Sequence, residues 1–372
     1  MPLLTILVCT YNRSRFLQVM LEALLPQAAK FEEEVEVWIV DNGSPDNTPA
    51  VIRNSHRLGP FKYHRHETNI GPLESGLFGI LNLAQGTYLW CLGDHNLLRP
   101  DALHNVVQSL RRHPNLDAFY VNFRCATYPD QWPSSALGGY DGEYDYLANE
   151  STSADPVPHW SDLISTSHTS AFCTQIYAHI IRRKVWRNFW QGRSFPKSHT
   201  RGISTYAHTW MLSSVLFNEP AGRIPEAALT IFNGAQSWGD PSTRAQVYMR
   251  GFPELIDLFI KQGLPDEKVS AARKFNFQQA QDAMSEFFLR PGVKPWREFL
   301  FYMRITTSHK YLWAALVAAF VESRFHRTSH AFKQCSTHFN RTRLYLYRHN
   351  RFSRWWHRRS SLRSHKEERS DS

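Results

Sequence analysis

The stretch "LTILVCTYNRS", Leu4 to Ser14, sets the architecture of this chain. An unbroken apolar run ends in polar residues, and a helical pattern of leucines follows at once. A continuous apolar run is typical of a strand buried on both faces, and apolar residues three and four positions apart predict a helix. We therefore expect a strand that leads directly into a helix, with Ser14 as the helix cap.

The same unit recurs through the first 125 residues. Four further segments predict strands, "VEVWIV", "FKYHRH", "TYLWCL" and "DAFYVNFRC", and helical patterns lie between them. Gly86 is expected to end one of these helices. Alternating strands and helices predict an α/β fold with a mainly parallel sheet and helices on both faces. After about residue 240 the pattern is helical only, which predicts a C-terminal all-α extension.

These changes of pattern predict the domain organisation. Residues 1–238 form the α/β domain, divided into halves at 1–125 and 126–238. Residues 239–330 form the helical extension. Residues 331–372 form a basic aromatic tail whose polar end is expected to be disordered.

Charge is concentrated in the tail. The chain has 372 residues and a net charge of +10. The segment from Val321 onward contains 13 basic and 4 acidic residues, so the preceding part is almost neutral. A neutral body without a nucleic-acid motif argues against nucleic-acid binding. The segment from Phe339 to Arg359 interleaves arginine with Trp and Tyr, which favours an anionic membrane surface as its partner. A basic helix packed on the catalytic domain is the alternative.

The cysteines and the apolar runs indicate the cellular compartment of the protein. The five cysteines have no paired spacing, which predicts reduced thiols and a cytoplasmic setting. The first residues lack a basic leader, so we expect a strand there and not a signal peptide. The longest apolar stretch, residues 311–321, is far shorter than the roughly 20 residues that a membrane-spanning helix needs.

Three of the predicted strands end in polar residues: "CTYNRS" after the first, "VDNGSPDNT" after the second and "LGDHN" after the fourth. The carboxyl ends of parallel strands meet at one edge of a sheet, and the helices that follow direct free N–H groups to the same edge. This arrangement predicts one site for a polar, anionic ligand. The alternative is that each segment is only a capped turn.

Residues 3–235 resemble the family 2 glycosyltransferases, which have the Rossmann-like GT-A fold. The resemblance is carried by "TILVCTYNRSRFLQVMLEALL", by "VWIVDNGSPDNT" and by "TNIGPLESGLFGILNLAQGTYLWCLGDHNLL". "AFCTQIYAHIIRRKVW" and "GISTYAHTWML" resemble the acceptor half of a branch that includes abequosyltransferases of O-antigen assembly.

The resemblance implies an enzyme that moves a hexosyl or deoxyhexosyl group from a nucleotide-sugar donor to a lipid-linked or cell-surface glycan. The glycan would be of O-antigen, lipopolysaccharide or exopolysaccharide type, and the enzyme would lie peripherally at the inner face of the plasma membrane. Asp41 would accept a hydrogen bond from the nucleobase. The other residues implied to bind the nucleotide sugar are Thr10, Tyr11, Asn12, Arg13, Asn42, Asn69, Gly71 and Asp94.

The fourth strand ends where the family has an acidic metal-binding motif, and here the chain departs from the family. The motif is Asp94-His95-Asn96, in which Asp94 and Asn96 are the implied ligands of a divalent metal, Mn²⁺ or Mg²⁺. Loss of carboxylates leaves two alternatives open: a site that has lost its metal, or a non-catalytic relative that binds a glycan or a partner protein.

The acceptor hydroxyl needs a base, and the resemblance implies His208 for this catalytic role beside Asp94. Histidine can accept a proton near neutral pH. A histidine packed on a helix face is the alternative, and Asp155 and Asp162 are other carboxylates in the same half.

Overall fold

The computed structural model describes residues 1–164, 173–194, 201–235 and 240–328. Residues Met1–Ala319 form one compact unit and Phe320–Ser372 a second, of which residues 320–328 are described. The predicted division at residue 238 falls inside the first unit and stays a prediction. The predicted tail, residues 331–372, lies outside the described residues. No helix in the described ranges is long and apolar enough to cross a bilayer.

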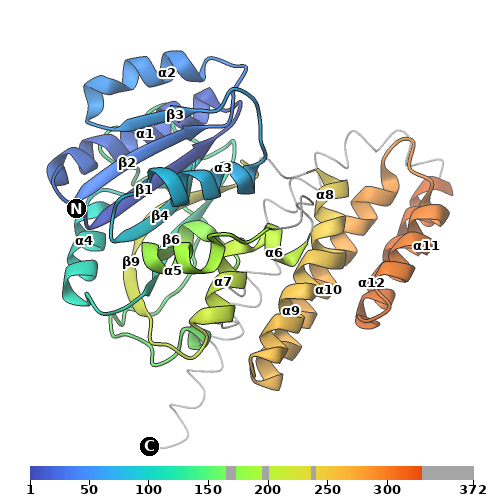
Figure 1. Ribbon diagram of the computed structural model, residues 1–372. Helices are drawn as coiled ribbons and strands as arrows, with labels where there is room; N and C mark the ends of the chain where they lie inside the picture. Colours follow the sequence, from blue (N-terminus) through green and yellow to red (C-terminus); the bar gives the residue numbers. More distant parts are fainter. Residues whose placement is uncertain (165–172, 195–200, 236–239, 329–372) are drawn as a thin grey trace, which may run out of the picture. The chain divides into compact units, whose positions relative to one another are not determined.

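Residues 4–233 form one sheet of nine strands with helices around it (Figure 1). Its strand order is β3-β2-β1-β4-β8-β6-β9-β5, and β7 pairs with β6. The strands are β1 Leu4–Thr10, β2 Val35–Asp41, β3 Lys62–Arg65, β4 Tyr88–Gly93, β5 Asn96–Leu98, β6 Ala118–Thr127, β7 Tyr146–Leu147, β8 His179–Arg182 and β9 Gly222–Asn233.

Most of the strands run in one direction, which confirms the prediction of a mainly parallel sheet. β1 pairs in parallel with β2 and β4, β2 with β3, and β6 with β9. The sequence did not reveal that β8 would enter between β4 and β6, antiparallel to both. β5 and β7 also run antiparallel to their partners.

Helices cover both faces of the sheet, as predicted. α1 packs with α2 and with α4, and α5 packs with α7 and with the π-helical turn Gly79–Leu83. The helices of this half are α1 Ser14–Ala28, α2 Thr48–Ser55, α3 Pro72–Phe78, α4 Ala102–Arg112, α5 Arg183–Trp190, α6 Gly202–Thr205 and α7 Ala207–Val215.

Burial explains why the first strand and helix form where the sequence predicts them. In β1, residues of both parities are fully buried, among them Ile6 and Leu7, as a strand between two helical layers requires. In α1 the predicted apolar face is buried at every position: Leu17, Met20, Leu21, Leu24 and Leu25.

Two local expectations were wrong. Ser14 does not cap α1. Instead its backbone N–H donates to Oδ2 of Asp46, 2.8 Å away, so a residue from the loop after β2 caps the helix. Gly86 does not end α3, because the helical segment is already over at Leu83. Gly86 is needed for close approach, since a Cβ there would lie 2.5 Å from the backbone nitrogen of Thr5.

The C-terminal part of the first unit is helical, as predicted. It contains α8 Pro241–Gln246, a π-helical turn Val247–Gly251, α9 Phe252–Lys261, α10 Asp266–Leu289, α11 Pro295–Ile305 and α12 Tyr311–Thr328, whose end belongs to the second unit. Asp240 caps α8 by accepting from the backbone N–H of Thr243. α9 packs against α6 and α7, which joins this region to the sheet domain.

Candidate functional site

The polar ends of β1, β2 and β4 lie side by side. Thr10 is in register with Asp41 on β2, and Cys9 is in register with Gly93 on β4. The segments that follow these strands therefore meet at one edge of the sheet, which is the predicted convergence. Figure 1 shows the helices α1, α2 and α3 around this parallel half.

Asp94, immediately after β4, is the centre of this edge. Its Oδ2 accepts from the hydroxyl of Thr10, 2.9 Å away. Its Oδ1 accepts from Nε of Arg13 at 2.8 Å and lies 3.2 Å from Nδ1 of His95. The Asp94 side chain is only 5% exposed. A buried carboxylate is stable when it is paired and hydrogen-bonded, and Arg13 and Thr10 supply both conditions.

Arg13 is fixed by more than the carboxylate. Its Nη2 donates to the carbonyl oxygen of Ala235, which follows β9. Its guanidinium lies over the ring of Phe16, 4.1 Å from the centroid, and the side chain is 14% exposed. Contacts with α1, with the end of β4 and with the segment after β9 hold the guanidinium in one place.

Asp41, at the end of β2, is fully buried. Its Oδ1 accepts from the backbone N–H of Ser44, and its Oδ2 accepts from the hydroxyl of Tyr63, both at 2.8 Å. Nη1 of Arg65 lies 3.6 Å from the same Oδ2. Burial, and then the neighbouring Asp41, raise the pKa of Tyr63 to about 12. A nucleobase that reaches Asp41 has to share it with these groups, so the predicted contact stays a prediction.

Asn42 connects β2 to the segment before α3. Its amide nitrogen donates to Oδ1 of Asn69 at 2.9 Å and to the carbonyl of Gly71 at 3.2 Å, and its Oδ1 accepts from the backbone N–H of Ile70 at 3.0 Å. Asn69 in turn accepts from the N–H of Gly71. The structure thus brings together three of the predicted nucleotide-sugar residues, Asn42, Asn69 and Gly71, in one hydrogen-bonded loop.

Tyr11 and Asn12 lie at the open side of the same edge. Tyr11 is 41% exposed. Asn12 has a φ of 54°, and its backbone N–H donates to the hydroxyl of Ser44 at 2.9 Å. The turn after β1 is therefore tied to the turn after β2, while the tyrosine ring stays accessible to a ligand.

The residues after β4 do not form a set of ligands that fits a divalent metal. Oδ1 of Asn96, the predicted second ligand, accepts from the N–H of Gly93 at 2.7 Å, so the amide oxygen closes the turn. Nδ2 of Asn96 is buried and has no partner among the described residues. Both oxygens of Asp94 already accept from Thr10 and Arg13. In the described ranges no group of three His, Cys, Asp or Glu residues is placed to hold a metal ion. The predicted metal roles of Asp94 and Asn96 receive no support from these contacts.

His208 lies on α7 and is 3% exposed. Its Nε2 is 3.2 Å from the carbonyl oxygen of Cys173 and 3.0 Å from the hydroxyl of Thr209. The ring of His179 lies beside it, with 5.5 Å between centroids. Burial, and then His179, lower the pKa of His208 well below its usual value. The arrangement is closer to the alternative of a packed histidine than to an open base.

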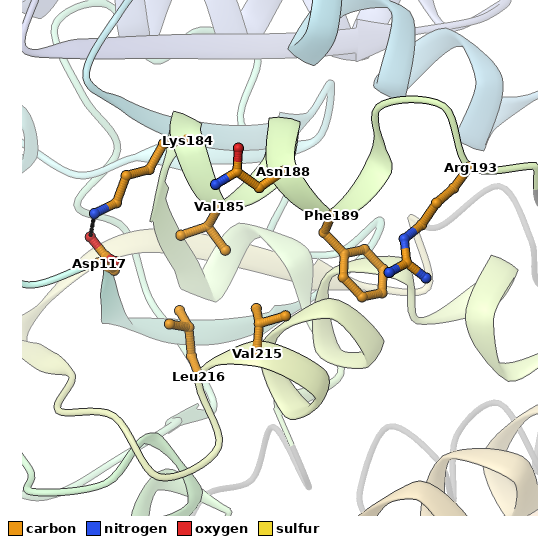
Figure 2. Close-up of a pocket in the computed structure, with 8 residues that line it drawn as sticks. All are labelled: Asp117, Lys184, Val185, Asn188, Phe189, Arg193, Val215 and Leu216. Carbon is orange, nitrogen blue, oxygen red and sulfur yellow. Dashed lines mark ion pairs between the residues drawn. The ribbon is translucent and has the colours of Figure 1, made fainter.

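A separate hollow of about 400 Å³ lies between α5, α7 and the start of β6. Figure 2 shows Asp117 and Lys184 at one end of it, 3.3 Å apart as an ion pair, and Arg193 beside Phe189 at the other. Arg182, at the end of β8, is in register with Tyr88, the first residue of β4. The hollow is therefore at the opposite edge of the sheet from Asp94.

The partners of Asp41 were not predicted from the sequence: Tyr63, Arg65 and Ser44. Tyr63 and Arg65 alternate on β3, the edge strand beside β2, and this spacing was the available signal. The hydrogen bond from Arg13 to the carbonyl of Ala235 could not be predicted from the sequence, because every residue has a backbone carbonyl.

Residues 5–194, just over half of the chain, match the profile of Glycosyl transferase family 2. The chain belongs to this family. Among curated proteins, the abequosyltransferase RfbV of Salmonella typhimurium is 34% identical over 104 residues, which are 27% of this chain and 30% of RfbV. The minor teichoic acid biosynthesis protein GgaA of Bacillus subtilis is 26% identical over 139 residues, 37% of this chain and 29% of GgaA. These matches span less than a third of either relative.

Solved structures of the same fold extend further along the chain. S. aureus TarS residues 1–349, in complex with UDP-GlcNAc, has a TM-score of 0.51 and 13% identity, and the match covers 87% of this chain and 90% of that chain. The same TarS fragment without a named ligand has a TM-score of 0.50. These likenesses support the GT-A fold of the family for this chain.

Proposed function

We propose that this chain is a glycosyltransferase that moves a hexosyl or deoxyhexosyl group from a nucleotide-sugar donor to a hydroxyl of a lipid-linked or cell-surface glycan. The observation that carries the proposal is the meeting of three polar strand ends around Thr10, Asp41 and Asp94. In the reaction, the bond between the sugar and the diphosphate breaks, the acceptor oxygen bonds to the sugar, and the hydroxyl proton passes to a base. Family membership and the names of RfbV and GgaA support polysaccharide assembly as the setting.

The donor is assigned to the edge of the sheet between β1, β2 and β4. Asp41 and Asn42 are proposed for the nucleobase and ribose side, where the exposed Tyr11 can contact the base. The turn of Thr10 to Arg13 and the loop of Asn69 to Gly71 are proposed for the diphosphate. The TarS fragment forms a complex with UDP-GlcNAc, which makes UDP a reasonable first probe for this chain.

Calorimetric titration with UDP, GDP, CDP and dTDP tests this donor assignment. We expect one nucleotide to bind, and we expect Asp41→Asn to weaken it, because the amide cannot accept on both of its atoms. Glu32→Gln, an exposed carboxylate before β2, is the control and should bind like the parent chain. Absence of binding by all four nucleotides would contradict the proposal.

We propose His208 as the base, with Nδ1 as the atom that accepts the proton. Its Nε2 faces the Cys173 carbonyl, so in the neutral ring Nε2 carries the hydrogen and Nδ1 is the atom that can take the proton. The lowered pKa keeps the ring neutral near pH 7, which is the form a base requires. His208→Gln should abolish transfer and leave nucleotide binding unchanged. Transfer at the parent rate would show that another group acts as the base.

A non-catalytic relative is the second candidate, because Asn96 replaces an acid and Arg13 already neutralises Asp94. A catalytic chain is expected to hydrolyse its nucleotide sugar slowly in the absence of acceptor. A chain that binds the nucleotide sugar and leaves it intact, with a panel of glycan acceptors as well as with water, favours the second candidate.

Peripheral binding to the inner face of the plasma membrane is proposed through the basic aromatic tail. On α11, Leu300 and Phe301 are 63% and 51% exposed and lie near the exposed Arg297 and Arg304, a combination that also suits a membrane interface. The full chain should sediment with vesicles that contain anionic lipid, and less so as salt rises. A chain that ends at Thr328 should sediment less. Equal sedimentation of both chains removes the tail from the proposal.

A further inference from the structure

We infer that the guanidinium of Arg13, and not a divalent cation, compensates the charge of the donor diphosphate in this chain. This inference rests on the proposed function of the same site. Two observations support it. The residues after β4 do not form a set of ligands that fits a divalent metal, and Arg13 already forms an ion pair with the Asp94 carboxylate.

The Asp94 carboxylate already has a cation. Nε of Arg13 lies 2.8 Å from Oδ1, and Thr10 donates to Oδ2. A divalent metal bound to either oxygen would lie about 2 Å from it and close to the guanidinium, so the two cations would repel each other in a buried site. Asn96 offsets this cost only weakly, because it is a neutral ligand whose amide oxygen already accepts a hydrogen bond from the N–H of Gly93.

Arg13 retains the donors that a diphosphate needs. A guanidinium has five N–H groups, and among the described residues Arg13 uses one on Asp94 and one on the Ala235 carbonyl, which leaves three. In the described chain no residue accepts from Nη1. The planar fork of arginine matches two phosphate oxygens, and its weaker hydration suits a partly buried ion pair better than a lysine would.

The position of Arg13 is also appropriate. It directly precedes α1 and follows Thr10 to Asn12, the turn proposed for the diphosphate. Phe16 lies against the guanidinium and Ala235 holds Nη2, so the free edge has a fixed orientation before any ligand arrives. Asp94 then acts as a positioning residue, which orients Arg13 but also reduces the positive charge that a diphosphate meets.

Because of this role of Asp94, the inference predicts the direction in which nucleotide affinity changes when Asp94 loses its charge. Asp94→Asn keeps an oxygen that can accept from Arg13 and removes the negative charge. If Arg13 binds the diphosphate, the variant should bind nucleoside diphosphate in EDTA as tightly as the parent or more tightly. If Asp94 holds a metal, the variant should lose the affinity that Mn²⁺ provides.

The experiment is calorimetric titration of the full chain with UDP, GDP, CDP and dTDP, in EDTA and in Mn²⁺. We expect the parent affinity to differ by less than about threefold between the two buffers. Arg13→Gln should weaken binding in EDTA by about tenfold or more, as loss of a charge-assisted fork does. Arg13→Lys, which keeps the charge and loses the fork, should be intermediate. Arg53→Gln, an exposed arginine on α2, is the matched control and should bind like the parent.

Circular dichroism and thermal unfolding identify a variant that fails to fold. If Arg13→Gln does not fold, Arg13→Lys and Asp94→Asn still decide the question. Binding of the parent that is tenfold or more tighter in Mn²⁺ than in EDTA overturns the inference and leaves the proposed function standing. Parent-like binding by Arg13→Gln in EDTA also overturns it. Absence of nucleotide binding in both buffers contradicts the proposed function together with the inference.

Discussion

The Nε atom of Arg13 lies 2.8 Å from Oδ1 of Asp94, although the two residues are 81 positions apart in the chain. Their strands are neighbours, because β1 pairs in parallel with β4 and both end at the same edge. The two turns that follow these strands therefore share one ion pair. Because the two side chains are only 14% and 5% exposed, salt should screen this pair less than the exposed pairs elsewhere on the chain, such as Arg290 with Asp240.

Thr10→Val should loosen this pair. The substitution keeps the shape of a buried β-branched side chain and removes the hydroxyl that donates to Oδ2 of Asp94. One acceptor atom of a buried carboxylate then lacks a partner, which should lower the free energy of unfolding by about 1–3 kcal/mol. Urea denaturation measures this loss. A stability equal to that of the parent would mean that water replaces the hydroxyl.

Asn42→Ala should release the loop before α3. The side chain makes three hydrogen bonds, to Asn69, Ile70 and Gly71. We expect a weaker nucleotide affinity by about tenfold, because the loop is then ordered only on binding. Calorimetry measures the affinity. Asn54→Ala, an exposed asparagine on α2, is the control and should leave the affinity unchanged.

The paired histidines should make the fold sensitive to mild acid. Burial lowers the pKa of His179 to about 4, and burial together with His179 lowers that of His208 well below its usual value. The native rings stay neutral while the unfolded chain takes up protons below its usual histidine pKa, so the free energy of unfolding falls as pH falls from about 6.5 toward 4. Each histidine adds up to about 1.4 kcal/mol per pH unit to this slope.

Urea denaturation at a series of pH values checks this slope. His208→Gln should reduce the slope, since one of the histidines with a lowered pKa is removed. His104→Gln, an exposed histidine on α4, should leave the profile as in the parent. A pH profile that is flat from 6.5 to 5 would contradict the burial of both rings in solution.

Gly86→Ala should destabilise the sheet next to β1. The added Cβ would lie 2.5 Å from the backbone nitrogen of Thr5, and backbone cannot move aside cheaply there. We expect a loss of about 1–3 kcal/mol in the free energy of unfolding. Gly76→Ala is the control, because a Cβ at this helical position meets nothing within 4 Å and should stabilise α3 by about 0.5–1 kcal/mol.

The sequence alone determined the α/β unit of the first 125 residues and the edge of the sheet at which the polar strand ends meet. Continuous apolar runs specify strands that are buried on both faces, and the burial of Ile6 and Leu7 on adjacent positions of β1 agrees with this prediction. Once strands and helices alternate, handedness and parallel pairing bring the strand ends together. The sequence could therefore predict that Thr10, Asp41 and Asp94 lie at the same edge of the sheet.

The tertiary structure decided how those residues are used. An apolar run has the same pattern in either direction, so the sequence could not reveal that β8 runs antiparallel between β4 and β6. The roles of Asp94 and Asn96 depended on partners far away or on the backbone: Arg13 for the carboxylate and the N–H of Gly93 for the amide. Hydrogen-bond partners are chosen by proximity in three dimensions, and a list of residue types contains no such distances.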